Sequence, residues 1–300
     1  MEDAHSFVVD FDSVRGQGFF AVFDGHAGKH AAEWCGRHFH ECLLSSMHAS
    51  PDSAIPDVLN EAFHKVDESL SHICKESDGK IHSGCTAVTA FLRIEDSDGR
   101  QSFRRDSKLL PSSPRLRAEK LKGSQGANHV SSITYNADNS ATVESDIIVP
   151  PTHSRRVLYT ANAGDARGVL CRNGQAVRLT YDHKGTDKQE ARRIMDAGGF
   201  IMSGRVNGVL AVTRSLGDPS MKEFVVGAPY TTETELCEDD EFLVLACDGL
   251  WDVISDQGAV ELVQDVQDAQ EASEMLLSYA LLHHTTDNVT VLVVRFKHFG

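Results

Sequence analysis

The sequence predicts a mixed α and β fold in which short strands form a sandwich and helices cover the sheets. Eight apolar stretches have the length of strands, and turn residues separate many of them. Five longer stretches have helical periodicity. A chain of 300 residues, 41% of them hydrophobic, has enough apolar side chains for one sizeable core or two modest ones.

The predicted strands lie along most of the chain and alternate with turn residues. They span residues 5–11, 18–23, 86–94, 156–163, 168–171, 176–179, 241–247 and 289–296. Many short strands of this kind favour a sandwich over a parallel sheet.

The predicted helices lie between these strands. They span residues 30–44, 54–75, 188–197, 255–266 and 269–283, and the third is closed by Gly198 and Gly199. Helices of this length must cover sheet faces, so the class is mixed α and β.

From about residue 95 to residue 154 the periodicity gives way to Ser, Pro, Asn, Asp and basic residues. We predict a long, mobile insertion within a single domain that spans residues 1–300. Its segment 100–122 is strongly basic, although the chain has a net charge of -15. This segment is either a solvated loop or a docking site for an acidic partner protein.

Composition excludes several classes of function. Asp and Glu total 44 against 29 Lys and Arg, which disfavours nucleic acid as a partner. The seven cysteines contain no C-x-x-C pair and are expected to be reduced, structural thiols. The amino terminus is acidic, and no apolar run has the length of a membrane span, so we expect an intracellular protein without a membrane partner.

Four aspartates share one context, because each lies at the end or the start of an apolar strand. They are Asp24, Asp165, Asp248 and Asp287. Any single Asp-Gly pair is most often a hairpin turn, but recurrence weakens that interpretation. Clustered carboxylates need cations, and oxygen ligands select hard ions such as Mg²⁺ or Mn²⁺.

A histidine follows the first of these aspartates. His26 lies two residues after Asp24, where its side chain is suited to donate a proton beside such a site. Taken alone, His26 is more simply a histidine on the surface or at the entry to a helix.

At nine places in order, the chain resembles the type 2C metal-dependent protein phosphatases, in particular their small fungal members. The matching segments are MEDAH at 1–5, FDGHAG at 23–28, SGCTA at 83–87, AGDAR at 163–167, LTYDHK at 179–184, RVNG at 205–208, LAVTRSLGD at 210–218, ACDGLWD at 246–252 and TDNVT at 286–290. They extend over nearly the whole chain outside the insertion, which makes the resemblance specific.

The resemblance implies an α+β fold with four layers, in which helices flank both faces of a central antiparallel β-sandwich. It implies that Glu2, Asp24 and the Gly25 carbonyl hold one Mn²⁺ or Mg²⁺ ion, and that Asp24, Asp248 and Asp287 hold a second. Asp165 with Asp248 is similar to a weaker third site.

By the same resemblance, the paired ions activate a water that attacks phosphoserine or phosphothreonine in line. His26 would then protonate the leaving oxygen, and a flap at about 183–207 would place Arg205 beside the substrate. The expected substrates are phosphorylated proteins such as kinases of stress or signalling pathways. The enzyme is expected to act as a monomer in the cytoplasm and also in the nucleus.

One departure from the family pattern concerns the phosphate. Family members carry an arginine that grips the phosphate just before the triplet that matches Met1 to Asp3, and the sequence printed here starts at Met1. We therefore expect it to have weak affinity for phosphate.

Two alternatives remain open from the sequence. Asp10 and Asp12 fit the D-x-D-x-T/V pattern of haloacid-dehalogenase-like phosphatases, in which the first aspartate is phosphorylated. The chain is alternatively a relative that binds phosphoproteins with little turnover. Manganese-dependent hydrolysis of a chromogenic phosphate ester separates an enzyme from such a binding protein.

Overall fold

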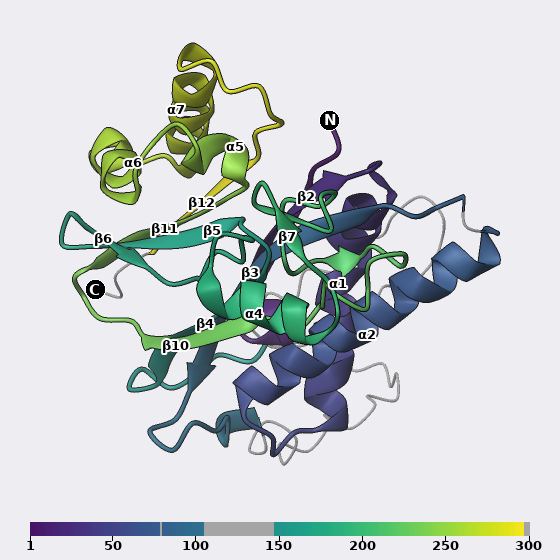
Figure 1. Ribbon diagram of the computed structural model, residues 1–300. Coiled ribbons are helices and arrows are strands. Elements are labelled where there is room, and N and C mark those ends of the chain that lie inside the picture. The colour runs from purple at the N-terminus through teal and green to yellow at the C-terminus, as the bar shows by residue number, and fades with distance from the viewer. Residues whose placement is uncertain (79, 105–146, 297–300) are drawn as a thin grey trace, which may run out of the picture.

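The protein folds as two antiparallel β-sheets stacked face to face between layers of helices (Figure 1). The computed structural model describes residues 1–78, 80–104 and 147–296. Every pairing between its named strands is antiparallel. The predicted α+β class, with a sandwich and flanking helices, is confirmed.

The first sheet has six strands. Five of them follow the order β1-β2-β3-β4-β10, and β9 pairs with β3 outside this order. Its strands are β1 (Ala4–Val9), β2 (Gly18–His26), β3 (Gly84–Glu95), β4 (Arg155–Ala163), β9 (Leu216–Gly217) and β10 (Tyr230–Glu235). The second sheet has four strands in the order β12-β11-β5-β6. They are β5 (Arg167–Arg172), β6 (Gln175–Arg178), β11 (Asp240–Ala246) and β12 (Val291–Arg295).

The helices form two outer layers. On one side lie α1 (His30–Ala49) and α2 (Ile55–Glu76), and on the other α5 (Asp248–Trp251), α6 (Asp256–Val263) and α7 (Ala269–Leu282). A further helix, α4 (Lys188–Asp196), lies beside the sandwich with the short hairpin β7 (Ile201–Met202) and β8 (Arg205–Val206). No helix in the described ranges is both long and apolar enough to cross a membrane.

Alternation along the strands divides the apolar side chains among three layers of core. On β2, for example, Phe19 and Phe23 pack against α1 and α2, whereas Phe20 and Val22 face the other sheet. The outer face of the second sheet packs against α5, α6 and α7. Because both faces of each sheet are covered, strands such as β3 are buried almost throughout.

The structure contains elements that periodicity did not predict. Strand β10 has the sequence YTTETE and lies at the edge of the first sheet, where it pairs only with β4. Its side chains alternate between partly buried and exposed positions, so it carries no apolar signal. Helix α5 is a single turn directly after β11, too short to have a readable period.

At both ends of the predicted insertion of about 95–154, residues belong to the folded structure. Glu95 is the last residue of β3, where its buried carboxylate pairs with Arg93 and Arg155. Phe103 is buried, and Ile148 forms a bridge with Val14. The basic segment of 100–122 falls mostly on residues outside those that the structure describes.

The predicted flap of 183–207 contains α4 and the β7–β8 hairpin, and one buried carboxylate ties it to the chain that follows. Glu190 on α4 accepts hydrogen bonds from Arg193, Arg214 and the Thr213 hydroxyl. Burial alone would raise the pKa of Glu190, but the hydrogen bonds and charge of Arg214 outweigh it and lower the pKa to about 2. The ion pairs of Glu190 therefore anchor the flap at α4.

All seven cysteines lie within the described part of the chain, and all are free thiols. Cys35 and Cys85 contact each other in the core without a disulfide, at an Sγ–Sγ distance of 3.7 Å.

Replacing Glu190 tests the anchoring of the flap. We expect Glu190→Gln to lower the free energy of unfolding at pH 7 by about 3 kcal/mol, because the partly buried guanidinium groups of Arg193 and Arg214 lose their charged partner. A lowered folded pKa gives stability that is present above the unfolded value of 4.5 and is lost as pH falls toward 2. In urea denaturation, the difference between the two proteins should therefore shrink below pH 4.5.

A surface glutamate provides the control for this measurement. Glu33 pairs with Lys29 on the outside of α1, and Glu33→Gln should leave the free energy of unfolding nearly unchanged, because water screens an exposed pair. An equal loss in both variants, or a loss for Glu190→Gln that does not change with pH, would contradict the anchoring role.

Candidate acidic active site

The predicted acids meet at one end of the sandwich because the strands that carry them end there. Asp24 lies near the end of β2, and Asp165 lies in the turn that carries the chain from β4 to β5. Asp248 directly follows β11 and opens α5. Registers that pair Ala87 with Ala163 and Ala246 with Arg167 bring these strand ends to the same edge.

Three carboxylates form a tight group at this edge. Oxygen atoms of Asp24, Asp165 and Asp248 all lie within 4.8 Å of one another. Burial, followed by the charge of Asp248, raises the pKa of Asp24 to about 9, and burial followed by the charge of Asp165 raises that of Asp248 to about 7. Burial also raises the pKa of Asp165. The group therefore has a strong demand for positive charge.

A fourth acid, Asp3, joins this environment and was not predicted as a site residue. Its Oδ2 accepts a hydrogen bond of 2.7 Å from the Thr290 hydroxyl, while its buried Oδ1 has no partner among the described residues. Burial raises the pKa of Asp3, and the charge of Asp287 adds to the effect. The resemblance to a Met-Glu-Asp triplet pointed to Glu2, although its neighbour Asp3 carries the unpaired oxygen.

The glycines after two of the acids permit neighbouring chain segments to approach. A Cβ atom on Gly25 would lie 2.3 Å from the carbonyl oxygen of Glu2, and one on Gly249 would lie 2.0 Å from that of Asn288. The amide of Glu2 also donates to the Asn288 side chain. The two Asp-Gly pairs are thus sites of close packing around the acids, not hairpin turns.

Glu2 and Asp287 lie beside the three-carboxylate group but outside it. Oε2 of Glu2 accepts a hydrogen bond of 3.2 Å from the amide of Gly28, at the turn between β2 and α1. Asp287 is exposed, and its charge raises the pKa values of Asp24 and Asp248. Their assignment as metal ligands, with the Gly25 carbonyl, stays a prediction.

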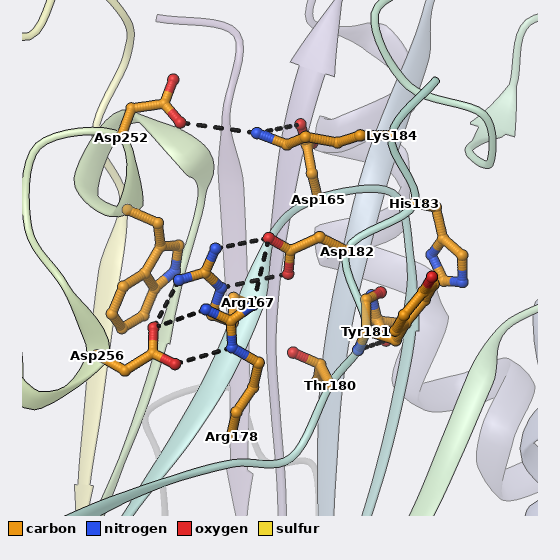
Figure 2. A network of polar contacts seen from close by, with 12 residues as sticks. Asp165, Arg167, Arg178, Thr180, Tyr181, Asp182, His183, Lys184, Asp252 and Asp256 are labelled. Atoms are coloured by element: carbon orange, nitrogen blue, oxygen red, sulfur yellow. Dashed lines mark hydrogen bonds and ion pairs between the residues drawn. The ribbon is translucent and has the colours of Figure 1, made fainter. Parts of the chain in front are cut away.

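A lysine already places positive charge against the group. Figure 2 shows Lys184 between Asp165 and Asp252, and its Nζ lies 3.3 Å and 3.6 Å from their carboxylate oxygens. Lys184 belongs to the LTYDHK segment, but it was assigned no role from the sequence. Asp252 likewise lies in the ACDGLWD segment without having been singled out.

A network of ion pairs fixes the backbone beside Lys184. Arg167 binds both oxygens of Asp182 and also contacts Asp256, and Arg178 binds Asp256 from the other side (Figure 2). Asp182 stands two residues before Lys184. The segment that carries the ammonium group is therefore held against the second sheet.

His26 lies on the same strand as Asp24 and has a carboxylate partner. Its Nε2 is 2.7 Å from Oδ2 of Asp218, a residue that the sequence placed in a motif without a role. The His26 side chain is 24% exposed, so it can reach a ligand at the site. Side chains two residues apart on a strand share a face, which turns His26 toward the same side as Asp24.

Arg205, the predicted substrate residue of the flap, is exposed on β8. Its guanidinium donates to the carbonyl oxygen of Val209 within the hairpin loop, at 2.8 Å. It has no ion pair with the three carboxylates. Its contact with substrate stays a prediction.

The alternative in which Asp10 is phosphorylated does not fit the structure. The register of β1 and β2 pairs Val9 with Gly18 and Ala4 with Phe23, so Asp10 lies at the opposite end of this strand pair from Asp24. Oδ1 of Asp10 accepts a hydrogen bond from the amide of Gly16 in the connecting turn. Asp12 is likewise engaged, by His48 and Arg104.

The acid group fits hard divalent cations. Its donors are all oxygen atoms, its members repel one another where they are buried, and Asp3 offers a buried oxygen without a partner. Carboxylate ligands of this kind suit Mg²⁺ and Mn²⁺. A bound cation would offset both the burial and the mutual repulsion that raise these pKa values.

Comparisons with known proteins agree with this geometry. The family model for "Protein phosphatase 2C" matches residues 1–97 and 94–289. The chain is 44% identical over 296 residues to Protein phosphatase 2C homolog 1 of Saccharomyces cerevisiae, which covers 98% of this chain and 87% of that protein. It is 40% identical over 295 residues to Protein phosphatase 2C homolog 1 of Schizosaccharomyces pombe, with 98% and 68% covered.

Solved structures with lower identity share the fold. A C. elegans sex determining protein has a TM-score of 0.71 at 24% identity, and the match covers 97% of this chain but 60% of that one. Serine-threonine phosphatase 2C from Toxoplasma gondii has a TM-score of 0.68 at 20% identity, with 99% and 90% covered. With two matched segments that together span residues 1–289 and two relatives of 40% identity or more in sequence, the chain belongs to the protein phosphatase 2C family.

Proposed function

We propose that this protein phosphatase hydrolyses phosphoserine and phosphothreonine in proteins by direct attack of water, with divalent metal ions held at the acid group. The observation that carries the proposal is the convergence of Asp24, Asp165 and Asp248 within 4.8 Å. Such a buried negative group has little structural use without a cation. Membership of the family removes the dehalogenase-like alternative, and the acid group argues against a protein that only binds phosphoproteins.

Different residues of the chain have different roles in the proposed reaction. The charges of Asp248 and Asp3 both act on Asp24, which would serve as a shared metal ligand, with Asp248 and Asp287 as further ligands. Two Mn²⁺ or Mg²⁺ ions, when bound, activate a water for in-line attack and neutralise charge on the phosphoryl oxygens. His26 donates a proton to the leaving oxygen.

Asp165 with Asp248 suits a weaker third site. Lys184 already partners Asp165, so a cation there has to compete with an ammonium group.

The other predicted properties follow from the resemblance and stay predictions. They are signalling kinases as substrates, action as a monomer, and a place in the cytoplasm and nucleus.

Asp248→Asn tests the metal site through stability as well as activity. The pKa of Asp248 is raised from 3.8 to about 7, so without metal its contribution to stability is greatest below pH 3.8 and is lost as pH rises through 7. In a chelator, Asp248→Asn should therefore melt at a higher temperature than the wild type, and by more at pH 8 than at pH 5. The variant should have lost hydrolysis of p-nitrophenyl phosphate.

Added Mn²⁺ completes this experiment, because it should raise the melting temperature of the wild type far more than that of the variant. Asp265→Asn, at an exposed position after α6, is the matched control and should change neither melting nor activity. Activity that persists in chelator, or a wild-type melting temperature that ignores Mn²⁺, would refute the metal mechanism.

His26→Ala tests proton donation. The variant should lower kcat for a phosphoserine peptide by about 10² to 10⁴ fold, and lower it much less for p-nitrophenyl phosphate. The reason is that p-nitrophenolate leaves readily without a proton, whereas a serine alkoxide does not. Steady-state kinetics with Mn²⁺ measures both, and equal losses on the two substrates would remove His26 from this role.

A further inference from the structure

Asp218 is an almost buried carboxylate that the proposed chemistry has not used. Its side chain is 8% exposed, and its Oδ2 is 2.7 Å from Nε2 of His26. The same oxygen accepts a hydrogen bond from the Ser215 hydroxyl. A buried carboxylate needs partners of this kind, and the imidazole is the ionisable one that the structure shows for it.

The backbone around Asp218 is shaped for this contact. Asp218 has a φ of 50°, in the left-handed region that few residues other than glycine adopt. Its carboxylate lies directly over Gly84, where a Cβ atom would be 2.1 Å from Oδ2. Gly84 pairs with His26 across β2 and β3, so this space exists beside the histidine.

A second carboxylate holds the loop in place from outside the site. Oδ1 of Asp67, on α2, accepts hydrogen bonds of 2.8 Å from the amide of Gly217 and from Nζ of Lys222. Lys222 also donates to the carbonyl oxygen of Ser215. The residues on both sides of Asp218 are therefore fixed to α2, and Asp67 has no hydrogen bond to His26 among the described contacts.

We propose that Asp218 is a positioning residue, which fixes the His26 ring through Nε2 so that Nδ1 delivers the proton. The proposal rests on the role of His26 proposed above. The hydrogen bond at one ring nitrogen decides the task of the other. With Nε2–H committed to the carboxylate, Nδ1 is the nitrogen left to face the leaving oxygen.

The step balances without a further reactant. The attacking water forms a bond to phosphorus and gives up a proton to solvent, while the bond from phosphorus to the serine or threonine oxygen breaks. That oxygen keeps the electron pair and takes the proton from Nδ1 of His26. The neutral ring, still donating through Nε2–H to Asp218, then regains a proton from solvent.

Asp218→Asn is the central variant, because asparagine keeps the size of the side chain and tolerates the left-handed conformation. We expect its kcat for a phosphoserine peptide to fall by roughly 10-fold or more, a part of the 10² to 10⁴ fold that general acid catalysis contributes. KM should change little, and the loss on p-nitrophenyl phosphate should be clearly smaller. The full chain is assayed with Mn²⁺.

Asp67→Asn is the matched control, because it loosens the same loop from a residue that does not touch His26. Its losses on the two substrates should be equal. In the double variant His26→Ala with Asp218→Asn, kcat for the peptide should be no lower than in His26→Ala alone. In ¹⁵N spectra of the Mg²⁺-loaded protein, Asp218→Asn should shift the signal of the Nε2–H group of His26, and Asp67→Asn should not.

The outcomes separate the two proposals. If His26→Ala loses equally on both substrates, then His26 is no proton donor, and the role of Asp218 falls with it. If His26→Ala discriminates between substrates but Asp218→Asn does not, only the positioning role is overturned. A further loss in the double variant would also overturn it. Should Asp218→Asn fail to fold, Ser215→Ala must show the same selectivity in smaller measure, or the proposal is wrong.

Discussion

The repulsion among buried carboxylates is the constraint on which the rest of this structure depends. Asp24, Asp165 and Asp248 come from both sheets and from three separate stretches of chain, yet their oxygens lie within 4.8 Å. Left to themselves, these groups would separate or take up protons, as the raised pKa values of Asp24 and Asp248 show. Only a rigid frame holds them together until a cation binds.

Ion pairs near the acids support the frame. Arg167 is shared by Asp182 and Asp256 on the side of the second sheet, and Glu190 in the flap is bound by Arg193 and by Arg214 of the chain that follows. These pairs contrast with the site itself, where Asp3 keeps a buried oxygen without a partner. Paired charges support the backbone, and unpaired charges are left for a ligand.

Much of this arrangement was readable from the sequence, and the limits have physical causes. The buried strands were predictable because burial requires continuous runs of apolar residues. The acids were predictable because each one ends or begins such a run. Strand β10 was not, since its edge position leaves YTTETE without an apolar face. Asp3, Lys184 and Asp218 were not assigned roles, because their partners come from distant segments. Asp218 stands 192 residues from His26, and no local pattern encodes such a contact.

The spacing of Asp24 and His26 on β2 determines how a substrate would be oriented in the proposed site. Asp24 and His26 are two residues apart on one strand, so they share a face and are separated by about 7 Å along it. A phosphorus atom attacked in line has its nucleophile and its leaving oxygen on opposite sides. In the proposed mechanism, the acid group at Asp24 lies on the side of the nucleophile, and the leaving oxygen points along β2 toward His26. Both residues lie in register with β3, where Asp24 pairs with Thr86 and His26 with Gly84, and this pairing fixes the separation. The distance between the acid group at Asp24 and the proposed proton donor His26 is therefore set by the backbone of β2. Contacts to the two side chains have only to fix their orientation.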